Sequence, residues 1–444
     1  MWFNLKELKD IINSKRVLKI ALPMMLSNIT VPLLGFVDTA VIGQLGDAKL
    51  IAALGLGSIL ISTLYWLCGF LRMGTTGLTA QAIGSKQTDE VSLTLLRGLL
   101  LGVFLGFFIL VIAYPIFFIF FLLSPAEVNV ETLALQYAEI RVLSAPFAIA
   151  TIPVIGWLIA LEKTLSVLFI QLFINLLNII LNLYFVFELE IGIEGVAYAT
   201  LISEIIGFLL ALFISFKALG NFPKLLKEKI FKKEKWKKLL YINSNIFLRS
   251  LLLELVFISF FFWASSFGTN ILAINQILIQ FLHISAYALD GFAFASEVLV
   301  GIYYGKKNIV FLRRSILLCA SWSAFTAIIF SVVFFIFGDA LIKFMTNAEE
   351  VLKIAKDFQI WIILVPLFSF PAYIMDGVFF GSTHTSEMRR AMIFSTVIYF
   401  ILAIFLTSIF QNSGLWTSLY VFFGNQSFYT FLLLSKYRTI SLIN

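Results

Sequence analysis

One segment of the chain carries four side-chain amides on a single helical face. Gln171, Asn175, Asn178 and Asn182 follow one another at spacings of four, three and four positions, and an α-helix returns to the same face every three or four residues. Leu, Ile and Phe occupy the other faces. Such a stripe can solvate a small cation or a carboxylate that carries a proton. The alternative is that it only joins helices through hydrogen bonds worth ~0.6 kcal/mol each.

A carboxylate in another apolar segment is the expected partner of these amides. Asp38 lies six residues after Pro32 in the run 21–43. Placing a charged side chain at the centre of a membrane helix costs at least ~2.5–3.5 kcal/mol, so such residues usually face a cavity or a pathway. Pro23 and Pro32 each remove a backbone hydrogen bond from this helix. We therefore expect protonation of Asp38 to be coupled to bending of the helix, unless Asp38 only caps the helix end.

The helices that must hold these residues are predicted to cross a membrane. The chain is 61% hydrophobic and 13% charged, with a mean hydropathy of +1.00, whereas soluble domains carry about 25% charged residues. Roughly 20 apolar residues cross a ~30 Å hydrocarbon core. The sequence predicts an all-α polytopic membrane protein with twelve spans, at about 17–42, 50–73, 97–122, 132–160, 165–187, 195–216, 239–267, 271–304, 315–338, 354–381, 391–410 and 414–434.

The two halves of the chain repeat each other. A shift of 221 positions brings Ala52 onto Ala273, Gly84 onto Gly305, Lys86 onto Lys307, Gly156 onto Gly377 and Thr164 onto Thr385. The repeat predicts two pseudo-symmetric lobes of six helices, an N-terminal lobe at 1–218 and a C-terminal lobe at 239–444, joined by a basic linker at 219–238. Parallel repeats of this kind are a common transporter architecture.

Positive charge predicts the orientation of the chain. Most Lys and Arg residues fall in the two terminal segments, the linker and the loops on one side, and such loops are cytoplasmic in membrane proteins. We therefore expect a multi-pass protein of the cell inner (plasma) membrane with both termini in the cytoplasm. The net charge of +7 is then a sign of topology, and we expect no nucleic-acid partner.

Carboxylates also occur in the predicted spans of the second half. They are Glu254, Asp290, Glu297 and Asp376, and the repeat does not place any of them opposite Asp38. The acidic sites are therefore not symmetric, which indicates different roles for the two lobes. Each of these residues could instead belong to a structural ion pair. The cysteines and histidines have no spacing typical of a metal or redox site, so we expect no cofactor.

The first predicted span resembles the first helix of the multidrug and toxic compound extrusion (MATE) transporters, and most closely their DinF branch. The resemblance extends over essentially the whole chain. It is carried by the residues Ala21-Leu-Pro-Met, Val37-Asp-Thr-Ala-Val-Ile-Gly43, Gly84-Ser-Lys, Asn178-Ile-Ile-Leu-Asn182, Gly195-Val-Ala-Tyr-Ala-Thr200, Leu289-Asp-Gly291 and Met375-Asp-Gly377.

This resemblance implies an antiporter that opens alternately to either side and exports amphipathic, often cationic, organic compounds in exchange for protons or sodium. In the family, the aspartate that matches Asp38 couples the ion to transport, and the positions that match Asn178 and Thr200 line the same cavity. The family commonly has aspartate where this chain has Asn182. That difference removes one negative ligand, so it favours proton coupling over a Na⁺ site formed by these four residues.

The resemblance leaves other roles open. Gln171, Asn175 and Tyr137 are expected to line the substrate cavity. Another branch of the family has a cation site in the C-terminal lobe built from acidic residues like Glu254 and Asp376, so a sodium role for this lobe stays open. We expect a monomer in the lipid bilayer that binds small organic molecules.

Two other functions are alternatives to the export of drugs. A flippase for lipids or lipid-linked sugars has a related architecture and needs a basic cavity, for which Arg72, Arg141 and Arg249 are candidates. An intramembrane enzyme is disfavoured because the sequence has no HExxH, GxSxG or paired-aspartate motif.

Overall fold

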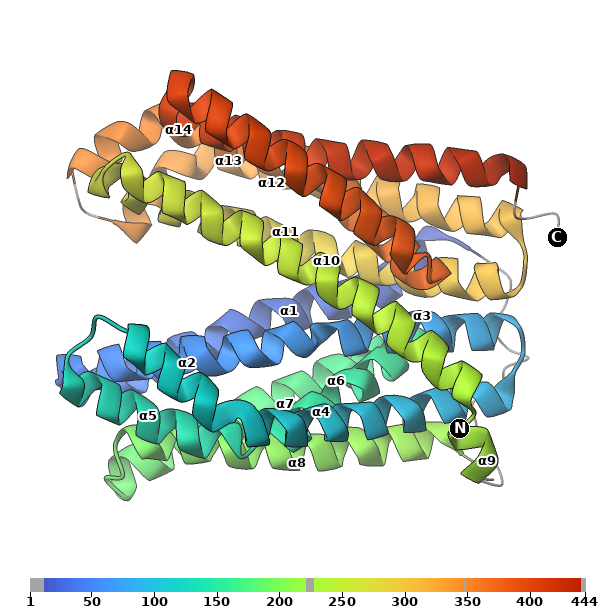
Figure 1. The fold of residues 1–444 in the computed structure, drawn as a ribbon, viewed down its shortest axis with the longest axis horizontal. Coiled ribbons are helices and arrows are strands. Elements are labelled where there is room, and N and C mark those ends of the chain that lie inside the picture. The colour runs from blue at the N-terminus through green and yellow to red at the C-terminus, as the bar shows by residue number, and fades with distance from the viewer. Residues whose placement is uncertain (1–11, 221–226, 347–348, 441–444) are drawn as a thin grey trace. The chain divides into compact units, whose positions relative to one another are not determined.

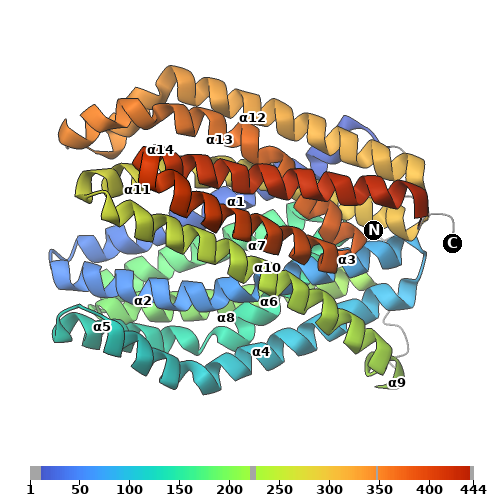
Figure 2. The ribbon, with the colours of Figure 1, turned by 45° about the horizontal axis from the view of Figure 1, so that its top comes forward.

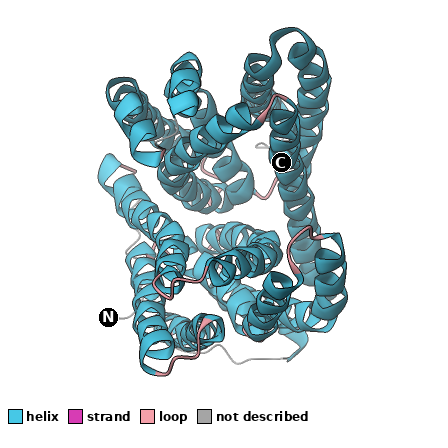
Figure 3. Ribbon diagram, turned by 90° about the vertical axis from the view of Figure 1, so that its left-hand side faces the viewer, coloured by secondary structure: helices cyan, strands magenta, loops and turns pink. Residues whose placement is uncertain are grey.

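The computed structural model describes residues 12–220, 227–346 and 349–440. Throughout these ranges the chain forms helices joined by short loops, without β-strands (Figure 3). Apolar residues fill the long helices, and many large apolar side chains point outward, as expected of a surface that faces lipid. The predicted all-α polytopic class is confirmed.

The helices of the first half are labelled in Figure 1. They are α1 (Ser14–Gly43), α2 (Ala48–Trp66), α3 (Phe70–Gly84), α4 (Thr88–Leu123), α5 (Val128–Val142), α6 (Ala145–Ala160), α7 (Thr164–Leu183) and α8 (Ile193–Leu219). A 3₁₀ turn, η2 (Leu67–Gly69), joins α2 to α3, and a π-helical turn, η3 (Tyr184–Glu188), extends α7.

Apart from the one-turn helix α9 (Lys227–Ile230), the helices that follow are longer than most of those in the first half. They are α10 (Lys233–Ser266), α11 (Thr269–Gly305), α12 (Ile309–Met345), α13 (Glu349–Ser382) and α14 (Thr385–Ile440).

The described helices account for twelve membrane spans. Ten are long and apolar enough to cross a membrane, and the bent pair α5–α6 adds one more. The last of the ten, Thr385–Phe428, has 44 residues and would be about 66 Å long if it were straight. It is broken at Gln411, where φ is 49°. The two arms fold back on each other (Figure 2), and the rings of Tyr399 and Phe422 lie 6.1 Å apart.

The predicted single span at 132–160 is wrong in detail. It consists of α5 and α6, whose axes differ by 55°. Pro146 lies in the first turn of α6, where its missing N–H costs no hydrogen bond. Extending one straight helix through this point would require that N–H. The chain therefore bends at Leu143 and Ser144 and starts a new helix.

The chain divides into two compact units. Unit 1 contains Leu26–Leu239, and unit 2 contains Leu240–Asn444 together with Asp10–Met25, so far as these ranges are described. The helix α1 thus contributes its first part to unit 2 and its longer second part, with Pro32 and Asp38, to unit 1. All described positions of the predicted linker 219–238 fall in unit 1, and its positions 221–226 lie outside the described residues.

Part of the linker is fixed to α4. Arg97 is buried and donates to the backbone carbonyl groups of Lys229, at 2.7 Å, and Ile230, at 3.0 Å. Its third bond, of 2.8 Å, goes to Glu90. The basic segment that follows the first six spans is therefore held by specific hydrogen bonds within unit 1.

The internal repeat extends to backbone conformation. Non-glycine residues with positive φ recur at the 221-residue shift: Lys86 (59°) matches Lys307 (55°), and Glu162 (58°) matches Thr383 (57°). Close helix contacts recur in the same way, since a Cβ atom on Gly156 would collide with the carbonyl of Arg72, and one on Gly377 with that of Ala293. The two halves therefore share loop conformations and close helix–helix contacts, as expected of two pseudo-symmetric lobes.

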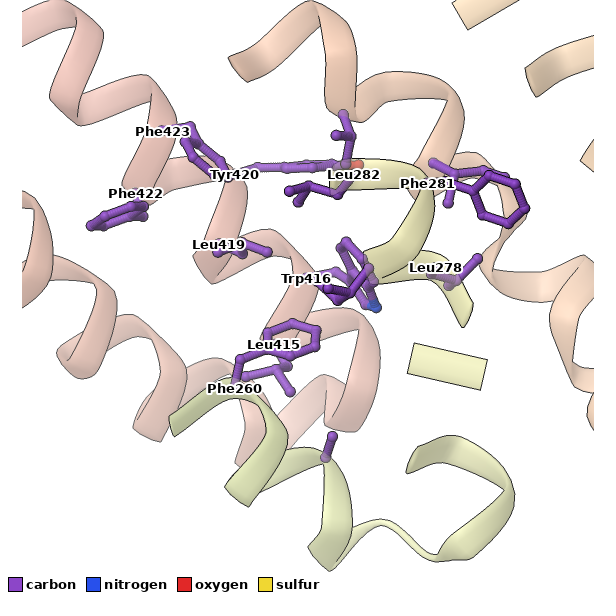
Figure 4. Packing of buried hydrophobic residues seen from close by; sticks show 14 of the residues in the cluster. Phe260, Leu278, Phe281, Leu282, Leu415, Trp416, Leu419, Tyr420, Phe422 and Phe423 are labelled. Atoms are coloured by element: carbon purple, nitrogen blue, oxygen red, sulfur yellow. The ribbon is translucent and has the colours of Figure 1, made fainter. Parts of the chain in front are cut away.

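Aromatic side chains dominate the core of unit 2. Trp416 is fully buried, with its ring 5.1 Å from that of Phe260 (Figure 4). Its indole N–H donates to Asn275 at 2.9 Å, and Asn275 and Asn412 donate to each other. In this closed network the polar side chains of Trp416, Asn275 and Asn412 satisfy one another by hydrogen bonds.

Candidate functional site

Asp38 lies in the second part of α1 and is only 8% exposed. One of its carboxylate oxygens accepts a hydrogen bond from the amide nitrogen of Asn182 on α7, at 2.5 Å. The residues that follow on the same helical face, Val41 and Ile42, pack in a buried cluster with Tyr137 of α5 and Val196 of α8. Four helices thus meet beside the carboxylate.

The contact between Asp38 and Asn182 begins a chain of side-chain hydrogen bonds. The amide nitrogen of Asn182 also donates to Asn178, at 2.9 Å, and the amide of Asn178 donates to the hydroxyl of Thr200 on α8, at 2.8 Å. Thr200 in turn donates to the carbonyl of Val196, at 3.0 Å. Asn178 and Asn182 are fully buried. The structure therefore brings all four predicted coupling residues into one network.

The other two amides of the stripe bind α1 at a second place. Gln171 donates to Asn175 at 3.1 Å, and Asn175 donates to the carbonyl of Thr30 at 3.2 Å. Thr30 and Asp38 are two helical turns apart on α1, as Asn175 and Asn182 are on α7. The amide stripe thus fastens the two helices at two levels, on either side of the Pro32 position.

Tyr137, a predicted cavity residue, is buried rather than open. Its ring lies on Gly57 of α2, where an added Cβ would approach to 2.6 Å. Its hydroxyl accepts a bond of 3.3 Å from Ser58. Tyr137 therefore closes the side of the site formed by α2 and α5.

A buried ion pair is the element that sequence reasoning missed. The sequence indicated Arg141 only as a candidate residue of a basic cavity, but Arg141 donates to both carboxylate oxygens of Glu204 on α8, at 3.0 and 3.2 Å. Arg141 also donates to Ser144 at 3.1 Å, and its guanidinium carbon lies 5.9 Å from the ring centre of Tyr65. The sequence offered one indication of this pair: Glu204 follows Thr200 by four residues, so the two lie on the same face of α8.

The predicted carboxylates of the second half all lie in unit 2. Asp376 on α13 accepts bonds from Arg249 on one oxygen and from Gln426, at 3.0 Å, on the other. Glu254 is partly exposed on α10, and Asp290 lies on α11 near Tyr287 and Tyr373. Among the described residues, no three His, Cys, Asp or Glu side chains converge as ligands of a metal ion.

Pro23 and Pro32, the predicted kink positions, both lie within the continuous helix α1. The structure records one state of this helix. Bending at these positions remains a prediction.

Comparison with known proteins agrees with the repeat. A family model described as MatE matches twice, at residues 23–184 and 246–407. The DNA damage-inducible protein F of Escherichia coli (strain K12) is 35% identical over 413 residues, which is 92% of this chain and 89% of that protein. A probable multidrug resistance protein NorM of Halalkalibacterium halodurans is 22% identical over 377 residues, covering 83% of this chain and 81% of its own length.

Solved structures share the fold. The crystal structure of a MATE protein in the bent conformation superimposes with a TM-score of 0.87 at 19% identity, over 100% of this chain and 99% of that one. Both halves match the family model, and the likeness to the DinF relative spans most of the chain. Members of the family are transporters that use ion coupling, not enzymes with cofactors. The chain therefore belongs to the MatE family of multi-pass membrane transporters and resembles its DinF branch.

Proposed function

We propose that this protein is an antiporter that exports amphipathic, cationic organic compounds in exchange for protons, and that Asp38 couples the two movements. The observation that carries the proposal is the chain of hydrogen bonds from Asp38 through Asn182 and Asn178 to Thr200. It connects a buried carboxylate on α1 to α7 and α8, so a change in its charge alters contacts among three helices. The multidrug names of several relatives support the choice of substrate class.

The donors around Asp38 favour a proton over a sodium ion. A hard cation needs several oxygen ligands. Here the nearest partner of the carboxylate is an N–H donor of Asn182, and the amide oxygen of Asn178 and the hydroxyl oxygen of Thr200 already accept bonds within the chain. A proton needs only the carboxylate oxygen itself. The network therefore holds a carboxylate ready to take up one proton.

Protonation provides the switch. A neutral Asp38 attracts the Asn182 amide less strongly, since hydrogen bonds to charged groups are about twice as strong as neutral ones. The second part of α1 is then held to α7 mainly at Thr30, and the missing N–H of Pro32 lets the helix bend. Binding of a cationic substrate requires the deprotonated form, so proton and substrate alternate at one carboxylate while the transporter opens to alternate sides.

The driving force is sufficient for export. Because one monovalent cation leaves for each proton that enters, the pH difference supplies the energy, and one pH unit is worth about 1.4 kcal/mol, which corresponds to about a tenfold concentration ratio. We propose a location in the cell inner membrane with both termini in the cytoplasm, because the linker, the ends and several loops on one side are basic. We also propose that a monomer is the working unit.

In the second unit, we propose that Arg249 serves as a permanent cation beside Asp376. Both oxygens of this carboxylate have donors, Arg249 and Gln426, which leaves little reason for sodium to bind there. The same reasoning counts against a flippase, because Arg141 and Arg249 are committed to carboxylates instead of offering free positive charge to a phosphate.

Transport by purified protein in proteoliposomes tests the function. Efflux of a fluorescent organic cation is followed after a proton gradient or a sodium gradient is imposed separately. The proposal predicts that the proton gradient drives transport and the sodium gradient does not. Transport driven by sodium alone would refute proton coupling, and movement of a lipid probe without movement of the cation would favour a flippase.

A further inference from the structure

The Arg141–Glu204 pair lies in the same unit as the coupling network, one helical turn away from it. On α8, Thr200 and Glu204 are four residues apart, and on α5, Tyr137 and Arg141 are four residues apart. Residues at this spacing share a helical face. Tyr137 packs with Val41 and Ile42, which continue the face of Asp38 on α1. The faces of α1, α5 and α8 that carry these residues therefore converge. The ion pair lies about one helical turn from Asp38.

The pair is built rigidly. Two bonds of 3.0 and 3.2 Å join Arg141 to Glu204, a third of 3.1 Å joins it to Ser144, and the ring of Tyr65 lies against the guanidinium. The Tyr65 hydroxyl donates to the backbone carbonyl of Arg141 at 3.0 Å. A buried guanidinium with this many partners stays charged. Charges one helical turn apart in an interior of low dielectric act on each other strongly, so the pair acts on the carboxylate of Asp38.

The charges of this cluster can be counted. Its charged side chains are Asp38, Arg141 and Glu204, and Tyr65 and Tyr137 add only hydroxyl groups beside them. The cluster thus has two negative charges and one positive charge when Asp38 is deprotonated, a net charge of −1. It becomes neutral when it takes up one positive charge, and a second would leave an uncompensated charge in a medium of low dielectric.

We propose that the Arg141–Glu204 pair fixes the charge capacity of the Asp38 site at one, so that the site holds either one proton or one monovalent organic cation. The substrate class is then monocations, with dications excluded, and one proton leaves the site for each monocation that binds. This inference rests on the proposed function, because it assumes that Asp38 is the shared binding group. Arg141 and Glu204 act as positioning and charge-setting residues.

Three variants distinguish the effect of the cluster's net charge from the effect of the ion pair's shape. Arg141→Gln gives the cluster a net charge of −2, Glu204→Gln gives 0, and the double variant Arg141→Gln/Glu204→Gln returns to −1. The double variant is the matched control, because it removes the ion pair yet keeps the wild-type sum. It also avoids the unpaired buried carboxylate that could prevent Arg141→Gln from folding.

The experiment uses the full-length protein in detergent micelles. Tetraphenylphosphonium, a monovalent cation, or dequalinium, a dication, is titrated in at a pH where the apo site is protonated, and bound cation and released protons are measured together. The wild type and the double variant should each release one proton per monocation and bind the dication weakly. Glu204→Gln should bind the monocation at least about fivefold more weakly, the lower end of typical coupling between sites. Arg141→Gln, if folded, should accept the dication and release two protons.

The outcomes distinguish this inference from the proposed function. If a folded double variant matched Glu204→Gln rather than the wild type, the pair would act through its shape, and the charge inference would be overturned. The same conclusion would follow if Glu204→Gln bound the monocation as the wild type does. If Asp38→Asn still released one proton per monocation, the proposed function itself would fail, whatever the pair does.

Discussion

Asp38 and Asn182 are separated by 144 positions in the sequence, yet a hydrogen bond of 2.5 Å joins them in the interior of unit 1. The same amide nitrogen donates to Asn178, so Asn182 is shared between the carboxylate of α1 and the chain that leads to α8. A single residue thus connects the charge of Asp38 to the packing of its neighbours. Its side chain is the place where small substitutions should have clear effects.

Replacing Asn182 by aspartate should change the ion that the site accepts. The second carboxylate would supply the oxygen ligands that the wild-type amide nitrogen does not, and two adjacent carboxylates hold a cation or a shared proton between them. We expect stimulation of cation efflux by sodium in this variant and none in the wild type. Efflux from proteoliposomes with and without a sodium gradient measures it. Asn175→Asp, further along the stripe, is the control and should gain nothing, and equal gains in both variants would argue against a specific site.

Thr200 should matter through its hydroxyl group. Thr200→Ser keeps the acceptor for Asn178, whereas Thr200→Val leaves the buried amide nitrogen of Asn178 without its partner, at a cost of about 1–3 kcal/mol. Proton-driven efflux is expected to survive in the serine variant and to fall about tenfold or more in the valine variant. Initial rates in proteoliposomes, normalised to inserted protein, measure this. Loss of activity in both variants would mean that the methyl group, and not the hydrogen bond, is required.

Arg249 should be important for stability. Arg249→Met leaves the buried carboxylate of Asp376 with the hydrogen bond from Gln426 but without a positive charge beside it, and removing one member of a buried ion pair typically costs about 3–5 kcal/mol. Thermal unfolding in detergent should show a clearly lower midpoint. The double variant Arg249→Met/Asp376→Leu removes both charges and should recover most of the loss. Failure of the double variant to recover would show that the arginine acts through packing alone.

The repeated glycines should tolerate no side chain. Gly156→Ala and Gly377→Ala each place a Cβ against a backbone carbonyl, of Arg72 and of Ala293, which cannot move without shifting a helix. Both variants should unfold at lower temperature. Gly55→Ala is the matched control: nothing lies within 4 Å of its added Cβ, and alanine is the better helix former by about 0.5–1 kcal/mol. If Gly55→Ala also lowered the unfolding temperature, the contacts of the added Cβ would not explain the loss of stability at Gly156 and Gly377.

The sequence predicted the features that depend on local pattern. Apolar runs located the spans, and the 221-residue shift found positions, such as Gly156 and Gly377, that have the same contacts in both halves. The amide spacing placed Asn178 and Asn182 on one face, and the family resemblance connected that face to Asp38. These predictions succeeded because helical periodicity and duplication are visible in a single chain.

Other features depend on contacts that leave no pattern. Arg141 and Glu204 pair across 63 positions between α5 and α8, and no rule of spacing joins residues on different helices. The bend between α5 and α6 was missed because apolar composition continues through it, and only Pro146 marks the new helix start. The burial of Tyr137 on Gly57 likewise follows from helix packing, which is set by the whole unit.

The most direct test of the central claim is proton movement driven by substrate in proteoliposomes that contain either the wild type or Asp38→Asn. A pH gradient is imposed, tetraphenylphosphonium is added, and the internal pH is followed with a trapped dye. The account predicts that the wild type dissipates the gradient when the cation is added, while the Asp38→Asn protein, inserted to the same level and equally folded, does not. Equal dissipation by the two proteins would contradict coupling through Asp38.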